Sequence, residues 1–242
     1  MNPMNPYTSD IDGKTRLGDA FLSRFELKVR SCGEIAVPSA GEIIRPDSGI
    51  QVQTPQRVFG DVRRFVFGGG LLKRIRLCLA AIVLKGTGLT GEKDLLRPAD
   101  SLLEQISGPL GLDIKEGVPH GIGVYSPVGW PQSWKIHAPD RGDIHFYLVE
   151  HLEGTAWLVF GSEGPWKNLF NPETAEEERI RAEKAMNTAP DLLFPGGQVP
   201  LDAFLVDFHL SRAGVQQAVE TSQGRYQVIE HKGRFAIQRT AR

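Results

Sequence analysis

Alternating hydrophobic and polar residues predict strands in several parts of this chain. Phe25, Leu27 and Val29 alternate with charged neighbours, which is the pattern of a half-buried strand. Residues 62–67 predict a second strand, and further strands are expected near residues 122–125, 134–137, 144–151 and 155–160. Because the strands from 122 onward follow one another through short turns, they are expected to form a meander in a largely antiparallel sheet.

Apolar residues at helical spacing predict helices elsewhere. From Leu71 to Val83 they recur as on a helix, and beyond Leu77 the segment is apolar nearly all round. A second helix is expected over residues 98–106, with a proline tolerated in its first turn. A strongly charged helix is expected to open at residues 171–174 and to run to about Asn187. The C-terminal section predicts helices 200–210 and 212–221, with a break at Ser211, and then a hairpin of strands 225–230 and 234–239.

These elements predict an α+β protein with a mixed, mainly antiparallel sheet core and flanking helices. All four tryptophans lie between Gly121 and Trp166, so the main core is expected there. Residues 1–18 are polar and turn-rich and are expected to be disordered or loosely attached. Residues 19–170 are expected to form the core domain and 171–242 a helical C-terminal domain, in which residues 189–199 read as a linker. The pattern leaves open whether residues 19–60 pack on the central sheet or form their own unit.

Composition limits the classes of partner and the compartment. The chain has 242 residues and a formal net charge of -1, so any attraction to nucleic acid or membrane must come from local patches. Its two cysteines, Cys32 and Cys78, have no metal-binding spacing, which argues against a disulfide framework or a zinc site. The longest apolar run, Leu77 to Leu84, is far shorter than the ~20 residues of a membrane-spanning helix. The N-terminus has no apolar signal core, and we expect a soluble, cytoplasmic protein.

The C-terminal section carries the most informative pattern, in the order helix, tight turn, helix and two-stranded ribbon. Residues 204–219 resemble the helix-turn-helix of winged-helix transcription regulators, especially those of the GntR type. In that pattern a serine caps the second helix and an arginine follows it, as Ser211 and Arg212 do here. Val215 and Ala218 match the Val and Ala positions that bury this helix against its partner. The resemblance covers about forty of the 242 residues.

Two positions in this stretch depart from the pattern. Leu205 stands where the first helix usually carries alanine, and His209 stands where the turn usually carries glycine. The resemblance therefore requires His209 to adopt a left-handed backbone conformation, which few residues other than glycine do.

The resemblance implies a surface for duplex nucleic acid. The second helix would present Arg212, Gln216, Gln217 and Glu220 to the major groove, and the wing would contact phosphates through Arg225, Lys232 and Arg234. From Pro195 to the end the chain has six basic and four acidic residues, fewer positive charges than dedicated DNA readers usually carry. Many winged helices instead bind proteins or are purely structural, because a fold does not fix a function.

A basic stretch lies earlier in the chain. Between Arg57 and Lys85 there are seven lysines or arginines and one acid, Asp61. These side chains could bind phosphate or nucleic acid together with the C-terminal section. The more common alternative is a solvated face, neutralised here by the acidic helix at 173–183.

Two glycine-rich segments resemble phosphate-binding loops. Gly86, Gly88 and Gly91 match the dinucleotide fingerprint, with Asp113 about 20 residues further on. That mechanism needs a strand before the glycines, whereas the preceding run is predicted to be a helix, so a helix cap and loop are favoured. Residues 68–70 could seat an anion but lack the GK[ST] of a P-loop, so a tight turn is favoured. No cofactor is assigned.

A central enzyme site is the remaining alternative. Four residues flank a predicted hairpin turn and could converge on a metal, namely His137, Asp140, Asp143 and His145. His145, Tyr147 and His151 would also share one face of a strand. A solvated turn with edge histidines is the more common interpretation, so no metal ligand is assigned, and no nucleophile motif is present.

The leading hypothesis is a nucleic-acid-associated protein that binds through its C-terminal module, with help from the basic stretch. The alternatives are a small-molecule-binding enzyme with a site in the His- and Trp-rich central region, and a protein–protein adaptor. Whether the protein is an enzyme stays open. Expected partners are duplex nucleic acid or another protein, and no membrane.

Overall fold

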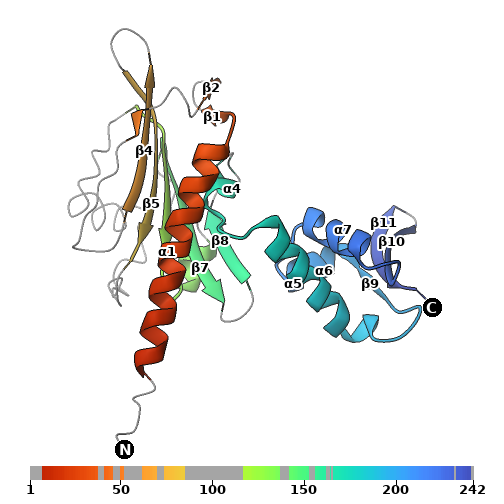
Figure 1. Ribbon diagram of the computed structural model, residues 1–242. Helices are drawn as coiled ribbons and strands as arrows, with labels where there is room; N and C mark the ends of the chain where they lie inside the picture. Colours follow the sequence, from red (N-terminus) through yellow and green to blue (C-terminus); the bar gives the residue numbers. More distant parts are fainter. Residues whose placement is uncertain are drawn as a thin grey trace, which may run out of the picture. The chain divides into compact units, whose positions relative to one another are not determined.

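The structure is a computed structural model of the 242-residue chain. It describes residues 7–37, 41–45, 50–51, 62–69, 74–84, 117–136, 142–152, 156–161, 164, 166–231 and 233–240. The chain divides into two compact units, of which the first comprises Met1–His151 with Trp157–Pro172 and the second Leu152–Ala156 with Glu173–Arg242. The described helices and strands confirm the α+β class (Figure 1).

The first unit is built on a six-stranded mixed sheet with the order β3-β4-β5-β6-β7-β8. Its strands are β3 (Ile50–Gln51), β4 (Val62–Gly69), β5 (Arg74–Val83), β6 (His120–Tyr125), β7 (Ile144–Leu152) and β8 (Ala156–Gly161). The β3–β4 and β4–β5 pairs are antiparallel, whereas β5–β6 and β6–β7 are parallel. The expected antiparallel meander is therefore wrong for β6 and β7, which run in the same direction.

Strand β5 replaces the helix that was predicted over residues 71–83. Leu77, Leu79 and Ala81 are buried in the cluster on one face of the sheet, and Ala80 and Ile82 in the cluster on the other. A strand that is covered on both faces is apolar at nearly every position, so its sequence does not differ from that of a buried helix. The strand predicted near residues 134–137 is likewise wrong, because Gln132–Ile136 forms the short helix α3.

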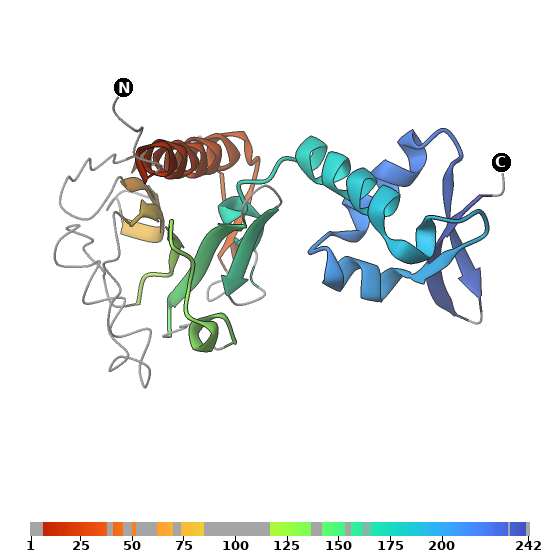
Figure 2. The same cartoon turned by 90° about the horizontal axis from the view of Figure 1, so that it is seen from below.

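Helix α1 (Tyr7–Ser31) covers one face of the sheet, and Figure 2 shows α3 on the opposite side. The strand predicted over residues 25–30 is therefore wrong. Phe21, Phe25 and Val29 are buried at four-residue spacing while Leu27 is 66% exposed, which is a helical rather than an alternating pattern. Residues 7–18, which were expected to be disordered or loosely attached, form the first half of this helix.

The segment that follows α1 also belongs to the first unit. Its hairpin pairs β1 (Ile35–Val37) with β2 (Glu42–Ile44), and Ile35, Val37 and Ile44 lie in the same buried cluster as α1. The indole N–H of Trp166 donates to the carbonyl of Ala36 at 2.8 Å. The described residues between 19 and 45 therefore pack on the central sheet, which the sequence left open.

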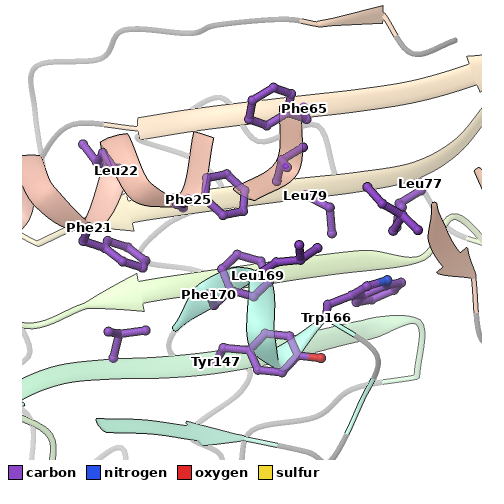
Figure 3. Close-up of a cluster of buried hydrophobic side chains, with 14 of the residues drawn as sticks. Phe21, Leu22, Phe25, Phe65, Leu77, Leu79, Tyr147, Trp166, Leu169 and Phe170 are labelled. Carbon is purple, nitrogen blue, oxygen red and sulfur yellow. The ribbon is translucent and has the colours of Figure 1, made fainter. Parts of the chain in front are cut away.

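Aromatic side chains fill the space between α1 and the sheet (Figure 3). Phe170 of helix α4 (Lys167–Phe170) stacks on Phe25 with ring centroids 5.0 Å apart and on Tyr147 at 4.8 Å. Strand β6 carries Gly123 opposite this ring, where a Cβ atom would lie 2.2 Å from Phe170 Cδ1. All four tryptophans are buried, but most of the buried cluster under α1 comes from outside residues 121–166, through α1, β4 and β5, so the expected position of the main core is only partly right.

Tyr125 lies in the same cluster, and its burial predicts how the stability of the first unit changes at high pH. Burial raises the pKa of Tyr125 to about 12, above the value of about 10 for an exposed tyrosine. The neutral phenol is thus favoured by folding, and its contribution is present below pH ~10 and lost as the pH rises through about 12. In urea titrations read by tryptophan fluorescence, the wild type is expected to lose more stability over this range than Tyr125→Phe. An equal loss in both proteins would contradict this role of Tyr125.

The second unit has the element order helix, strand, helix, helix, strand, strand. Its elements are α5 (Ala175–Thr188), a 3-10 turn η3 (Pro190–Leu192), β9 (Gln198–Pro200), α6 (Leu201–Asp207), α7 (Arg212–Thr221), β10 (Tyr226–His231) and β11 (Arg234–Arg239). The three strands form an antiparallel sheet with the order β10-β11-β9. The predicted helices and hairpin are confirmed, but the expected linker at 189–199 holds η3 and the start of β9.

Candidate nucleic-acid interface

Helices α6 and α7 meet in a tight turn at residues 208–211. His209 has a φ of 51°, so the left-handed conformation that the resemblance required is confirmed. Ser211 is the N-cap of α7, and its hydroxyl accepts the N–H of Gly214 at 3.1 Å. Val215 and Ala218 are buried in the core of the second unit, as expected. Leu205, which replaces the usual alanine, packs partly buried against the same core.

Charged side chains of α5 hold this turn in place. The Arg181 guanidinium donates to both carboxylate oxygens of Glu173, at 2.8 and 2.7 Å, and also to the backbone carbonyls of Phe208 and His209. Because the side chains of Arg181 and Glu173 are only 11% and 6% exposed, the pair is largely withdrawn from water. The turn carbonyls are therefore bound to a fixed cation that belongs to the neighbouring helix.

A second carboxylate fixes the start of α7. Glu178 accepts the backbone N–H of Ser211 at 2.6 Å and its hydroxyl at 3.0 Å. Gly214 leaves room for this carboxylate, since a Cβ there would lie 2.7 Å from Glu178 Cδ. Polar contacts to α5 thus set the position at which α7 begins, in addition to the apolar core.

The exposed face of α7 carries the side chains that the resemblance assigned to base contacts. Arg212, Gln216, Gln217 and Glu220 are all exposed. Gln216 Nε2 donates to Glu220 Oε1 at 3.0 Å, so these two side chains hold one another along the helix. The guanidinium of Arg212 lies over the ring of Phe235 on β11, 4.4 Å from its centroid.

The basic residues assigned to the wing have different surroundings. Arg234 is exposed at the start of β11. Arg225 pairs with Glu183 of α5 at 2.9 Å and also donates to the carbonyl of Ser222, so its guanidinium is engaged within the unit. Lys232 lies outside the described residues. The structure thus brings Arg212 beside the β10–β11 hairpin but gives Arg225 a partner on α5.

Ion pairs among the described residues of the second unit engage three of its carboxylates, those of Glu173, Glu176 and Glu183. Residues 173–242 contain ten acidic and nine basic side chains. On α5, Arg179 bonds to Glu176 and Glu183, and its hydrogen bond to Glu176 holds the pKa of that carboxyl below the usual range. Among the residues that the structure describes, no ion pair engages Arg212 or Arg234. The positive charges of Arg212, on α7, and Arg234, on the hairpin, are therefore not neutralised by a carboxylate of the described residues.

Two of the seven basic residues in the stretch 57–85 form ion pairs within the first unit. Arg63 lies 3.4 Å from Glu26 and Arg76 lies 3.3 Å from Glu42. The expectation that the acidic helix at 173–183 neutralises this stretch is wrong for these two arginines. The side chains of Arg57, Lys73, Arg74 and Lys85 lie outside the described residues.

The central histidines contact tryptophan rings. His145 meets Trp166 edge-on at 5.5 Å, and His151 meets Trp157 at 4.9 Å. No cluster of three metal-binding side chains occurs among the described residues, and His137 and Asp140 are not among them. On the other face of β7, the buried Glu150 accepts the Nζ of Lys135 at 2.6 Å and the backbone N–H of Trp130 at 2.9 Å. This carboxylate anchors the loop between β6 and α3.

The strand required by the dinucleotide fingerprint does precede Gly86. This strand is β5, which ends at Val83. The helix that was predicted there, and that counted against the fingerprint, is therefore wrong. The glycines at 86, 88 and 91 and the acid at Asp113 lie outside the described residues, and so does the predicted helix at 98–106.

Phe235 and the α5 side chains that hold the turn are the features that sequence reasoning missed. Phe235 is a large apolar residue of β11 with 39% of its surface exposed, and the sequence of the hairpin, which holds several other apolar residues, does not single it out.

Over the described residues, every helix is too short or too polar to span a bilayer. Cys32 and Cys78, which are both described, are not joined by a disulfide. No protein-family model matches this chain, and neither curated proteins nor solved structures give a significant match.

Proposed function

We propose that the second unit is a winged helix-turn-helix that binds duplex DNA, with α7 in the major groove and the β10–β11 hairpin as the wing. The order of its elements and the pairing of β9 with β11 support this assignment. Such modules place the second helix of the pair in the groove and use its exposed side chains to contact bases. A cytoplasmic location is part of the proposal.

The exposed face of α7 is the observation that carries the proposal. It presents Arg212, Gln216 and Gln217 on a helix whose opposite side is buried through Val215 and Ala218. Arginine and glutamine are long side chains that can form paired hydrogen bonds with guanine and adenine edges. Because α5 fixes the turn before α7, this face is held rigidly, as base contacts require.

The charge distribution predicts modest electrostatic binding. Arg212 and Arg234, which are exposed, are candidates for phosphate or groove contact, and the sequence adds Lys232 as a third candidate. Arg225 is engaged with Glu183. Each phosphate contact contributes about −0.9 to the slope of log affinity against log salt concentration. For the intact protein and a mixed-sequence duplex, the slope of log affinity against log salt concentration is therefore expected to be no steeper than about −3.

Replacing Arg212 with alanine is expected to weaken duplex binding about 5- to 100-fold, because it removes one base contact and one positive charge. Gln217→Ala is expected to lower affinity without changing the salt slope, since it removes no charge. The measurement is fluorescence anisotropy of a labelled mixed-sequence duplex across a salt series.

Lys184→Ala is the matched control, because it removes one exposed positive charge from α5. It is expected to bind nearly as the wild type does. Equal losses for Arg212→Ala and Lys184→Ala would show that only net charge matters and would contradict binding through α7.

A protein-binding role is the second candidate. Phe194, next to η3, and Val206, on α6, are each 71% exposed, and exposed large apolar side chains are typical of protein contacts. Absence of duplex binding at low salt would favour this alternative.

A further inference from the structure

The exposed aromatic ring of the hairpin lies against the first residue of α7. Phe235 is the second residue of β11, and the guanidinium carbon of Arg212 lies 4.4 Å from the centre of its ring. This contact joins two residues that are 23 positions apart, across the gap between α7 and the hairpin. It places the guanidinium over the face of the ring.

Stacking of this kind restricts an arginine without using its hydrogen bonds. The attraction is between the cation and the ring face and needs no hydrogen-bond acceptor, so N–H groups directed away from the ring stay available to a partner. A free arginine loses much side-chain freedom when it binds, and a stacked one has lost part of it beforehand. Gln216, by contrast, is tied to Glu220 through its amide.

We propose that Phe235 is a specificity-determining positioning residue, which holds Arg212 so that it forms a bidentate contact with guanine in duplex DNA. The inference rests on the proposed function of the second unit. Guanine O6 and N7 offer two acceptors in one plane, which matches the edge of a stacked guanidinium. Arg212 is the first residue of α7, and the N-terminal residues of such a helix are those that face base edges.

A phosphate could also accept two hydrogen bonds from Arg212. Contact with phosphate and contact with guanine lead to different expected results. A phosphate contact strengthens binding to all sequences alike, whereas a guanine contact selects one base at one position. Arg234, which is exposed and forms no ion pair among the described residues, is the candidate for phosphate.

The test is selection of bound sequences from a randomised duplex pool by the intact protein. The wild type is expected to enrich sequences with one fixed guanine, and Arg212→Ala is expected to lose the preference at that position. Phe235→Leu, which keeps an apolar side chain but no ring, is expected to weaken the preference for guanine at the same position about tenfold. The base preferences at other positions are expected to persist. Phe235→Tyr, which keeps the ring, is expected to retain the preference for guanine.

A second readout follows the contact directly. In NMR spectra, the ring of Phe235 is expected to shift the Nε–H resonance of Arg212, and the shift should persist in Phe235→Tyr and vanish in Phe235→Leu. Unchanged melting of Phe235→Leu would show that the variant is folded.

The outcomes separate this inference from the proposed function. Selection of the same guanine by Phe235→Leu and the wild type would overturn the role of Phe235, and duplex binding without a guanine that depends on Arg212 would overturn the guanine contact. Both results would leave DNA binding intact. Failure of the wild type to bind any duplex would overturn the proposed function and this inference together.

Discussion

Replacing Arg181 with alanine is expected to destabilise the second unit by about 3–5 kcal/mol, the usual effect of removing one partner from a buried ion pair. Glu173 would lose its guanidinium partner in a site where its side chain is 6% exposed. The carbonyls of Phe208 and His209 would also lose their donor at the turn before α7. The measurement is urea unfolding of the intact chain followed by far-UV circular dichroism.

Tryptophan fluorescence provides an internal reference, because all four tryptophans belong to the first unit. Arg181→Ala should leave the fluorescence transition in place. The control is Arg225→Ala, which also removes a positive charge that pairs with α5, but from a side chain that is 53% exposed. Surface pairs of this kind contribute at most about 1 kcal/mol. Similar losses in the two variants would show that Arg181 does not anchor the turn.

Phe170→Ala is expected to destabilise the first unit by about 3–5 kcal/mol, the range for truncating a fully buried phenylalanine. The ring is 0% exposed and stacks on Phe25 and Tyr147. Removing it would leave a cavity above Gly123, which has no side chain to fill the space. The loss should appear in the tryptophan-fluorescence transition.

Leu27→Ala is the matched control for this substitution. Leu27 is a large apolar residue of α1, but 66% of its surface is exposed, so truncation removes little buried area. Its effect is expected to stay within about 0.5 kcal/mol. If Phe170→Ala were as mild as Leu27→Ala, the stacked aromatic cluster would not be the main support of α1 on the sheet.

Much of the second unit could be predicted because local sequence signals mark where its helices begin and where its hairpin turns. Thr174 and Glu177 form a capping box at the start of α5, and Ser211 caps α7. Gly233 has a φ of 75° in the turn of the hairpin, where glycine is favoured. Each signal acts within a few residues, so the sequence placed α7 and the hairpin strands within one residue of their observed bounds. It did not predict η3 or β9, and α6 ends three residues before the predicted helix does.

The first unit was predicted less well because its pattern is set by distant contacts. Phe25 and Val29 fit an alternating strand as well as a helix, and only packing of α1 on the sheet decides between the two. Strand β5 is covered on both faces, which hides the period that marks an ordinary strand. Parallel pairing of β5 with β6 joins segments about 40 residues apart, for which no local signal exists.

The same distinction applies to the candidate interface. Arg212, Gln216 and Gln217 follow from the resemblance of residues 204–219, and the structure places all three on the exposed face of α7. Phe235 meets Arg212 only once the hairpin folds back toward α7. The pairing of Arg225 with Glu183 spans 42 residues and could not be read from the sequence.

The most direct test of the account is backbone-amide NMR of the intact protein during titration with a mixed-sequence DNA duplex. If α7 binds in the major groove, salt-sensitive shifts are expected along residues 211–221 of the second unit and in its β10–β11 hairpin, with little change in the sheet of the first unit. Shifts that avoid α7, or no shifts at low salt, would contradict a duplex-binding role for this helix.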